Sequence, residues 1–227
     1  MDSISINLLE PRFAYSKQPA HGRRKRMQIL FGSALYAFIA FLALPGTSFA
    51  QSVLIDDAHT STAPKMSDSN FGANPNLFVN STGNVYIKFK LSSTLPAGTP
   101  SSAVERATLK LYLANITNPG KLDVYTVLGP WDEATITGRN APVLGNLFTT
   151  TTQIELDKRH EFLVIDITSL VRQWLGDDGH GLNGIPNNGI VIIAHPADAT
   201  TPEVANITFD SKENSQTSHE AQLNSVG

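Results

Sequence analysis

The sequence predicts an all-β protein, a jelly-roll β-sandwich of about ten strands with one short helix. Short apolar or alternating segments recur along the chain from residue 51 onwards, and clusters of Gly, Pro, Asn and Ser separate them. Such spacing is typical of antiparallel sheets joined by turns. A single stretch, residues 162–176, changes from strand-like to helix-like periodicity, and it predicts the one helix.

Two stretches show the period-two alternation of half-buried strands. Apolar side chains occupy every second position in residues 85–90 and again in residues 107–113. A turn at residues 118–120 connects the second stretch to a strand at residues 122–127, which predicts a hairpin. The remaining predicted strands are shorter or wholly apolar: residues 53–55, 77–79, 153–156, 162–165, 189–194, 205–209 and 221–226.

The helix follows directly on a buried strand. Residues 162–165 are apolar and partly β-branched, and Thr168 is a suitable N-cap for the turn that follows. Leu170 and Trp174 then fall on one helical face, and Gly176 stands where a residue with positive φ commonly ends a helix. We expect the helix to insert Trp174 into the core.

The first fifty residues predict export. A basic cluster at residues 22–26 precedes sixteen uncharged residues, 29–44, and small residues at positions 48 and 50 frame a cleavage site after Ala50. The alternative is an uncleaved membrane anchor. The expected organisation is therefore an N-terminal extension with a secretory signal peptide over residues 1–50, and a single secreted or cell-surface domain over residues 51–227.

Composition narrows the class of partner. Residues 51–227 keep 11 of the 17 basic and 18 of the 20 acidic side chains, a net charge of −7, which disfavours nucleic acid and membrane lipid as partners. The chain has no cysteine, so disulfides and thiolate metal sites are excluded. Nucleophile-elbow, phosphate-loop and zinc-protease motifs are also missing from the sequence, and we expect no enzymatic activity.

Seven short motifs occur in a fixed order along the chain: residues 70–72, 86–89, 107–112, 131–137, 166–174, 188–190 and 209–213. Together they resemble the DNRLRE domain, a family of secreted bacterial β-sandwich modules that overlaps carbohydrate-binding module family 96. The sequence departs from the family pattern at Gly138, where a second Trp is usual, and at Lys212, where Arg is usual. Lys keeps the charge but loses the forked donor geometry.

The resemblance implies an exported, non-catalytic jelly roll. Some relatives occur next to polysaccharide-degrading enzymes, and some of these bind alginate-type glycans. Other relatives belong to cell-surface proteins with no assigned ligand. Two functional hypotheses follow. The first is a polysaccharide-binding module with a preference for acidic glycans. The second is a structural or adhesive domain within a cell-surface assembly, with no small ligand.

The candidate glycan-binding residues share the outward phase of two predicted strands. In a chain of net negative charge, the Tyr and Lys residues at these positions are the candidates: Tyr86, Lys88, Lys90, Lys110 and Tyr112. Tyrosine rings stack on the C–H faces of sugars, and lysines bind carboxylates. The alternatives are a plain solvated sheet face, and separation of the two segments in the fold.

A structural Ca²⁺ is the one cofactor that the sequence suggests, because hard oxygen ligands suit this ion. The loop at residues 177–183 lacks the alternation of a calcium loop and is expected to be solvated. Oxygens gathered from separate loops are better candidates: Asp57, Asn70, Asp210 and Glu213. Glu133 and Glu213 are also the pair to inspect as catalytic carboxylates, with hydrogen bonding at strand turns as their expected structural role.

Overall fold

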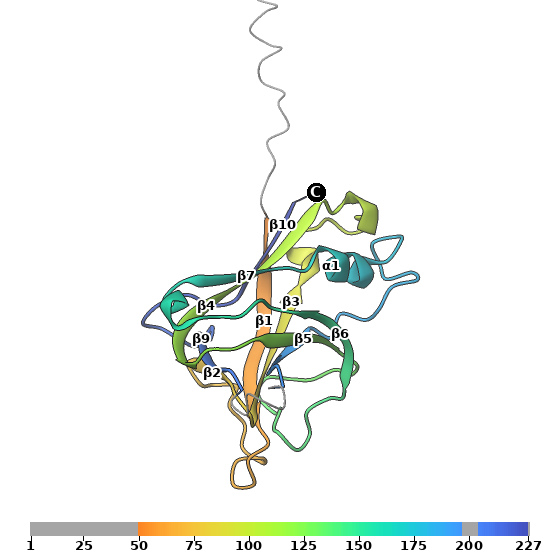
Figure 1. The fold of residues 1–227 in the computed structure, drawn as a ribbon. Coiled ribbons are helices and arrows are strands. Elements are labelled where there is room, and N and C mark those ends of the chain that lie inside the picture. Colours follow the sequence, from red (N-terminus) through yellow and green to blue (C-terminus); the bar gives the residue numbers. More distant parts are fainter. Residues whose placement is uncertain (1–49, 197–203, 227) are drawn as a thin grey trace, which may run out of the picture. The chain divides into compact units, whose positions relative to one another are not determined.

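One long strand, β1 (Ala50–Ser61), pairs with different partners along its length. In the computed structural model, which describes residues 50–196 and 204–226, residues 50–52 pair with β10 (Gln222–Val226). From Val53 on, β1 pairs with β3 (Gly83–Lys90), and the register shifts between Leu54 and Asp56. Strand β1 thereby continues the hydrogen-bonded ladder from one layer of the fold into the other (Figure 1).

Ten antiparallel strands form the two layers. One layer contains β7 (Phe162–Asp166), β4 (Arg106–Asn118) and β10, extended by β9 (Asn206–Asp210) and β2 (Asn76–Val79). The other contains β1, β3, β8 (Ile190–Ala194), β5 (Leu122–Val127) and β6 (Leu144–Thr150). The prediction of an all-β sandwich of about ten strands with one short helix is confirmed.

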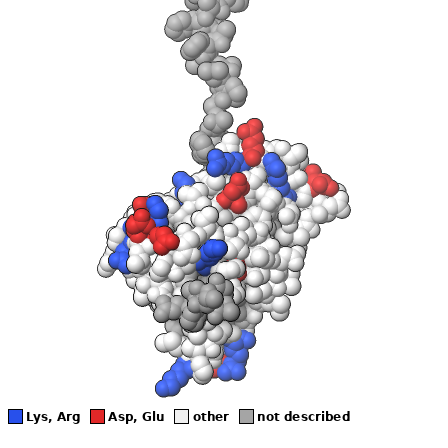
Figure 2. All heavy atoms as spheres, viewed as in Figure 1, with Lys and Arg blue, Asp and Glu red and all other residues white. Residues whose placement is uncertain are grey.

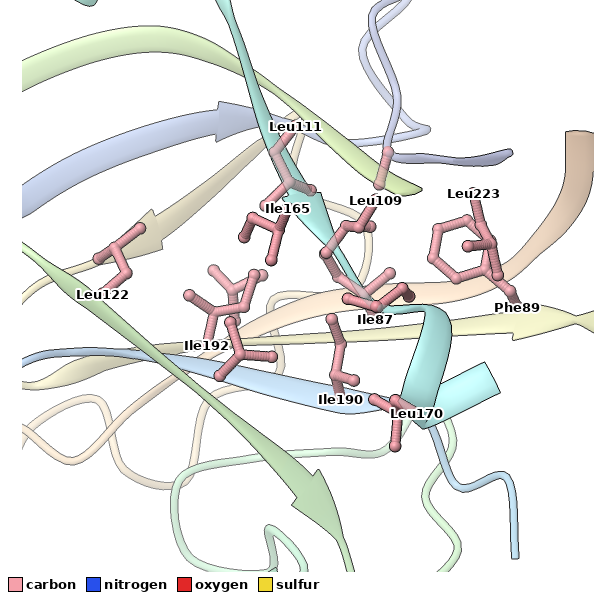
Figure 3. Packing of buried hydrophobic residues seen from close by; sticks show 14 of the residues in the cluster. Ile87, Phe89, Leu109, Leu111, Leu122, Ile165, Leu170, Ile190, Ile192 and Leu223 are labelled. Atoms are coloured by element: carbon pink, nitrogen blue, oxygen red, sulfur yellow. The ribbon is translucent and has the colours of Figure 1, made fainter. Parts of the chain in front are cut away.

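The core lies between the two layers. Leu109 and Leu111 of β4 face Ile87 of β3 and Ile190 and Ile192 of β8, as Figure 3 shows. All five side chains are at most 1 % exposed, so the alternating positions of these strands bury one face as the sequence predicts.

Helix α1 (Thr168–Leu175) closes one end of this core. Trp174 is 6 % exposed, which confirms the predicted insertion of its ring, and Gly176 has the expected positive φ of 65°. The predicted N-cap is wrong. Ile167 occupies that position. The Thr168 hydroxyl oxygen instead accepts a hydrogen bond from the Ala107 N–H at 2.9 Å, and this bond ties the helix to β4.

Three element boundaries differ from the prediction. Strand β1 runs to Ser61 through a stretch predicted to be polar loop, and β6 occupies a segment predicted to be loop because its sequence lacks clear alternation. The expected strand at residues 153–156 contributes one bridge, from Ile154 to Gly120. The structure adds three short 3-10 helices: η1 (Leu91–Ser93), η2 (Ser101–Ala103) and η3 (Leu156–Lys158).

The predicted signal peptide lies within residues 1–50. Of these, only Ala50 is among the described residues. Within the described part of the chain, no helix combines the length and the apolar composition that crossing a membrane requires. The expected cleavage point after Ala50 coincides with the first residue of β1.

Candidate functional site

The outer face of β3 is covered, so the expected exposure of Tyr86 is wrong. The ring of Tyr86 is 2 % exposed and meets the Trp131 ring edge-on, with 5.6 Å between centroids. Both rings belong to a second apolar cluster with Ala58 and Val191. The chain between β5 and β6 folds over this sheet face and buries it, and this burial raises the pKa of Tyr86 to about 12.

Lys88 is committed to contacts within the fold. Its Nζ lies 2.5 Å from Asp56 Oδ2, donates to the Trp131 carbonyl at 3.1 Å, and stands 5.0 Å from the centre of the Trp131 ring. A ligand would have to compete with all three contacts. Lys90 is exposed and forms no ion pair with any residue that the structure describes.

The five predicted glycan-binding residues do not form one surface. Strand β3 belongs to one layer and β4 to the other, and β1 and β10 stand between them in the ladder. The outer faces of these layers therefore point away from each other. Period-two alternation shows which residues share a side of one strand, but it carries no information on which strands are neighbours.

Lys110 and Tyr112, in contrast, lie close together on β4, and Tyr112 belongs to a group of partly exposed rings. Tyr112 pairs in register with Phe162 of β7, with 5.3 Å between ring centroids, and its ring lies 4.0 Å from that of His219. His160 completes the group at 6.4 Å from Tyr112. We call Tyr112, His160, Phe162 and His219 the ring surface.

Sequence reasoning missed three of the four rings of this surface, His160, Phe162 and His219, and for two of them the reason can be identified. Phe162 was expected in a buried strand, yet it is 41 % exposed because it takes the outward phase of β7. His219 lies in the segment between β9 and β10, which has no periodicity. The alternation of Phe162 and Val164 with Leu163 and Ile165 was the available signal, masked because all four are apolar.

A shallow depression of about 230 Å³ adjoins the ring surface. It is lined by Arg106, Thr108, Lys110, Val164, Asn224 and Val226. Lys110 makes no ion pair with any described residue, whereas Arg106 helps to lower the pKa of Asp166, which falls mainly through hydrogen bonds from Thr168. The uncommitted ammonium of Lys110 thus stands beside exposed rings.

Charged side chains are sparse on the face of the molecule that Figure 2 shows. They stand in small groups, with wide uncharged areas between the groups. The negative net charge therefore does not form one continuous acidic field over the described part of this face.

The four predicted calcium ligands do not converge. Asn70 uses its amide to donate to the carbonyls of Glu133 and Ile136, at 2.7 and 2.8 Å. Asp210 accepts hydrogen bonds from Asn214 and Thr217, at 3.1 and 2.6 Å. Asn70 thus ties its loop to the remote segment at residues 133–136, and Asp210 holds a local turn, so both side chains are already engaged within the protein.

Asp57 and Glu213 do come together, and Glu133 is the third member. One carboxylate oxygen from each lies within 4.8 Å of the others. The ammonium of Lys212 stands among them, 2.5 Å from Glu133 Oε2 and 2.8 Å from Glu213 Oε1. The backbone N–H of Lys212 donates to Asp57 Oδ2 at 2.9 Å. We call these four residues the Lys212 cluster.

A proton on Asp57 completes the hydrogen bonds of this cluster. The Ser211 hydroxyl lies 3.1 Å from Asp57 Oδ1 and 2.5 Å from Glu213 Oε2, but it carries one proton. Burial, with a smaller contribution from the nearby charges of Glu213 and Glu133, raises the pKa of Asp57 to about 7, although the hydrogen bond from the Lys212 N–H acts in the opposite direction. A protonated Asp57 can donate to Ser211 while Ser211 donates to Glu213.

The ammonium of Lys212 binds two of the three carboxylates that could together hold a metal ion. Burial alone would lower the pKa of Lys212, but its hydrogen bonds to Glu133 and Glu213 raise that pKa, so the residue stays charged. A divalent cation at these oxygens would have to displace this ammonium. Glu133 and Glu213 also differ from the expectation for them, because both bind this ammonium through their side chains and neither caps a strand turn.

Comparison with known proteins gives one family. The sequence model of carbohydrate-binding module family 96 matches residues 49–225, a range that includes both the ring surface and the Lys212 cluster. No curated protein matches the chain.

Proposed function

Because the chain belongs to carbohydrate-binding module family 96, we propose that it is an exported, non-catalytic module that binds an acidic polysaccharide through the ring surface and Lys110. The family supports carbohydrate as the ligand. The preference for acidic sugars and the location outside the cytoplasm are inferred from this chain's own residues.

The observation that carries the proposal is the pair of rings on β4 and β7, half-buried Tyr112 and exposed Phe162. Tyr112 and Phe162 present faces and edges on which the apolar C–H groups of sugars can pack. Strand β4 pairs with β7, β9 and β10, and β7 is hydrogen-bonded to β4 in register, so the two rings are held in place before a ligand arrives. A preorganised surface loses little conformational entropy on binding.

The preference for an acidic glycan rests on Lys110. Its ammonium has no carboxylate partner among the described residues. Lys110 lies two residues before Tyr112 on β4, so both side chains are on the outward face of the strand. A uronate carboxylate bound here would form a charge-assisted hydrogen bond. Arg106, further along the same face, extends the positive charge.

Titration of uronate oligosaccharides tests the proposal. Phe162→Ala should weaken binding by about 3- to 10-fold, the range expected for losing an aromatic contact. Lys110→Ala should weaken it by about 2- to 5-fold and reduce its salt dependence, since exposed ion pairs contribute little and are screened. The matched control is Lys90→Ala, an exposed lysine on the other layer, which should bind as the wild type does.

Equal binding by wild type and Phe162→Ala would refute the ring surface as the site. If no uronate oligosaccharide bound up to millimolar concentration, the structural or adhesive role within a cell-surface assembly would become the better account of this chain.

A further inference from the structure

A second concave surface lies on the other layer of the sandwich, against helix α1. It is a groove of about 450 Å³, a volume within the range of small-ligand sites. Its lining comes from β5, β6, α1 and the segment before β8, and it shares no residue with the ring surface. The lining residues are Thr126, Val127, Leu128, Asn146, Leu147, Phe148, Ser169, Gln173, Ile185, Pro186 and Asn188.

The groove has no charged residue in its lining, whereas the depression beside the ring surface contains Lys110 and Arg106. Apolar side chains and hydrogen-bonding side chains alternate along it. Leu147, 50 % exposed, stands next to Asn146, and Pro186 follows Ile185. The side chains of Asn146, Ser169 and Gln173 make no hydrogen bond to any other described residue, so their donors and acceptors remain free for a ligand.

The walls of the groove are fixed by hydrogen bonds that a ligand would not disturb. Asn188 donates from its amide to the Val127 carbonyl at 3.2 Å, and its own carbonyl accepts the Trp131 indole N–H at 2.8 Å. The backbone N–H of Ile185 donates to the Gln173 carbonyl at 2.9 Å, which ties the segment before β8 to α1. The groove is therefore preformed, and binding would cost little ordering.

We propose that this groove is a second glycan-binding subsite, which takes uncharged sugar residues. The inference rests on the proposed function, and it adds a second contact with a different chemical preference. Sugar hydroxyls would hydrogen-bond the free amides and hydroxyl, while sugar C–H faces would pack on Leu147, Phe148 and Pro186. An ionised sugar would find no counter-charge here and would lose hydration on entry.

A chain that carries two such subsites can hold one polysaccharide at two points, or hold two polysaccharides together. Binding at the second point would then be intramolecular, which raises the overall affinity without new contacts. The two subsites would also respond differently to salt, because only the ring surface relies on charge.

Isothermal titration of the domain with cellohexaose, mannohexaose and xylohexaose tests the subsite. In about 1 M NaCl, where the Debye length is about 3 Å, at least one of these uncharged hexamers should still bind. Gln173→Ala and Asn146→Ala should each weaken that binding by about 3- to 10-fold, the range for one lost hydrogen bond, and should leave uronate binding at low salt unchanged.

Phe162→Ala is the matched control, and its effects should be the reverse. The subsite is refuted if none of the three hexamers binds up to millimolar concentration, or if Phe162→Ala weakens their binding as much as Gln173→Ala does. Failure of the proposed function is a separate outcome, because the wild type would then not bind uronate oligosaccharides.

Discussion

Replacement of Asp57 with Asn should remove a large ionisation from the pH dependence of folding. In the folded protein, burial raises the pKa of Asp57 from 3.8 to about 7, so the folded state favours the protonated form. This contribution to stability is fully present below about pH 4 and is lost as the pH rises through 7. Asn cannot ionise, and its amide can reproduce the contacts of the protonated acid to Ser211 and to the Lys212 N–H.

The size of the effect follows from the gap between the two pKa values. At about 1.4 kcal/mol per pH unit, Asp57 should cost the wild type about 2–3 kcal/mol between pH 5 and pH 8. His59 acts in the opposite direction. Burial lowers its pKa to about 4, so its contribution is present above about pH 6.5 and is lost as the pH falls.

Because His59 is present in both proteins, the comparison must be made on the difference between variant and wild type. Urea unfolding at several pH values should show Asp57→Asn gaining about 2–3 kcal/mol on the wild type from pH 5 to pH 8. Asp68→Asn is the control, because Asp68 is exposed, pairs with Arg139 and has a lowered pKa. Its difference from wild type should stay constant over this range.

A constant difference for Asp57→Asn would refute the reasoning. It would mean that Asp57 remains ionised in the folded protein, beside Glu133, Glu213 and the ammonium of Lys212. The Ser211 hydroxyl would then lie close to two ionised carboxylates, those of Asp57 and Glu213. Its one proton could form a hydrogen bond to only one of them.

Further predictions concern the core, the helix end, metals and export. Trp174→Ala should lower the free energy of unfolding by about 3–5 kcal/mol in denaturant melts, and a loss below about 1 kcal/mol would show an exposed ring. Gly176→Ala should destabilise by at least about 1–2 kcal/mol in the same assay, because φ is 65° and a Cβ would press on a carbonyl of the next loop. Neither Ca²⁺ nor a chelator should shift the melting temperature of the wild type, whereas a shift with Ca²⁺ would show that an ion displaces Lys212. Mass spectrometry of the exported protein should find Gln51 at its N-terminus, and recovery of the uncleaved chain from membranes would contradict cleavage.

Local pattern predicted what depends on one strand or helix at a time. The alternation in β4 identified its buried leucines, and the change of period after β7 identified the helix and the burial of Trp174. These features follow from the geometry of a single element against a core. No knowledge of the partner strand is needed to predict them.

Features that depend on distant segments were not predictable in the same way. Tyr86 has the alternation of an exposed residue, but it is buried because a segment more than forty positions later, around Trp131, covers it. The Lys212 cluster likewise combines residues from three remote parts of the chain, Asp57, Glu133 and Lys212–Glu213. Its chemical types could be named from sequence, but its membership required the fold.

The pairing of the first strand with the last sets how the domain would respond to force. Residues 50–52 of β1 lie antiparallel to residues 223–225 of β10, so both ends of this pair leave the same side of the fold (Figure 1). Tension applied between the two ends would break the hydrogen bonds of these pairs one after another, which requires little force. Tension between residue 50 and a glycan held on β4 would act along the strands and load many ladder hydrogen bonds at once. The domain would therefore open at low force when it is pulled between the two ends of this strand pair. It would resist a higher force when it is pulled between residue 50 and a bound polysaccharide.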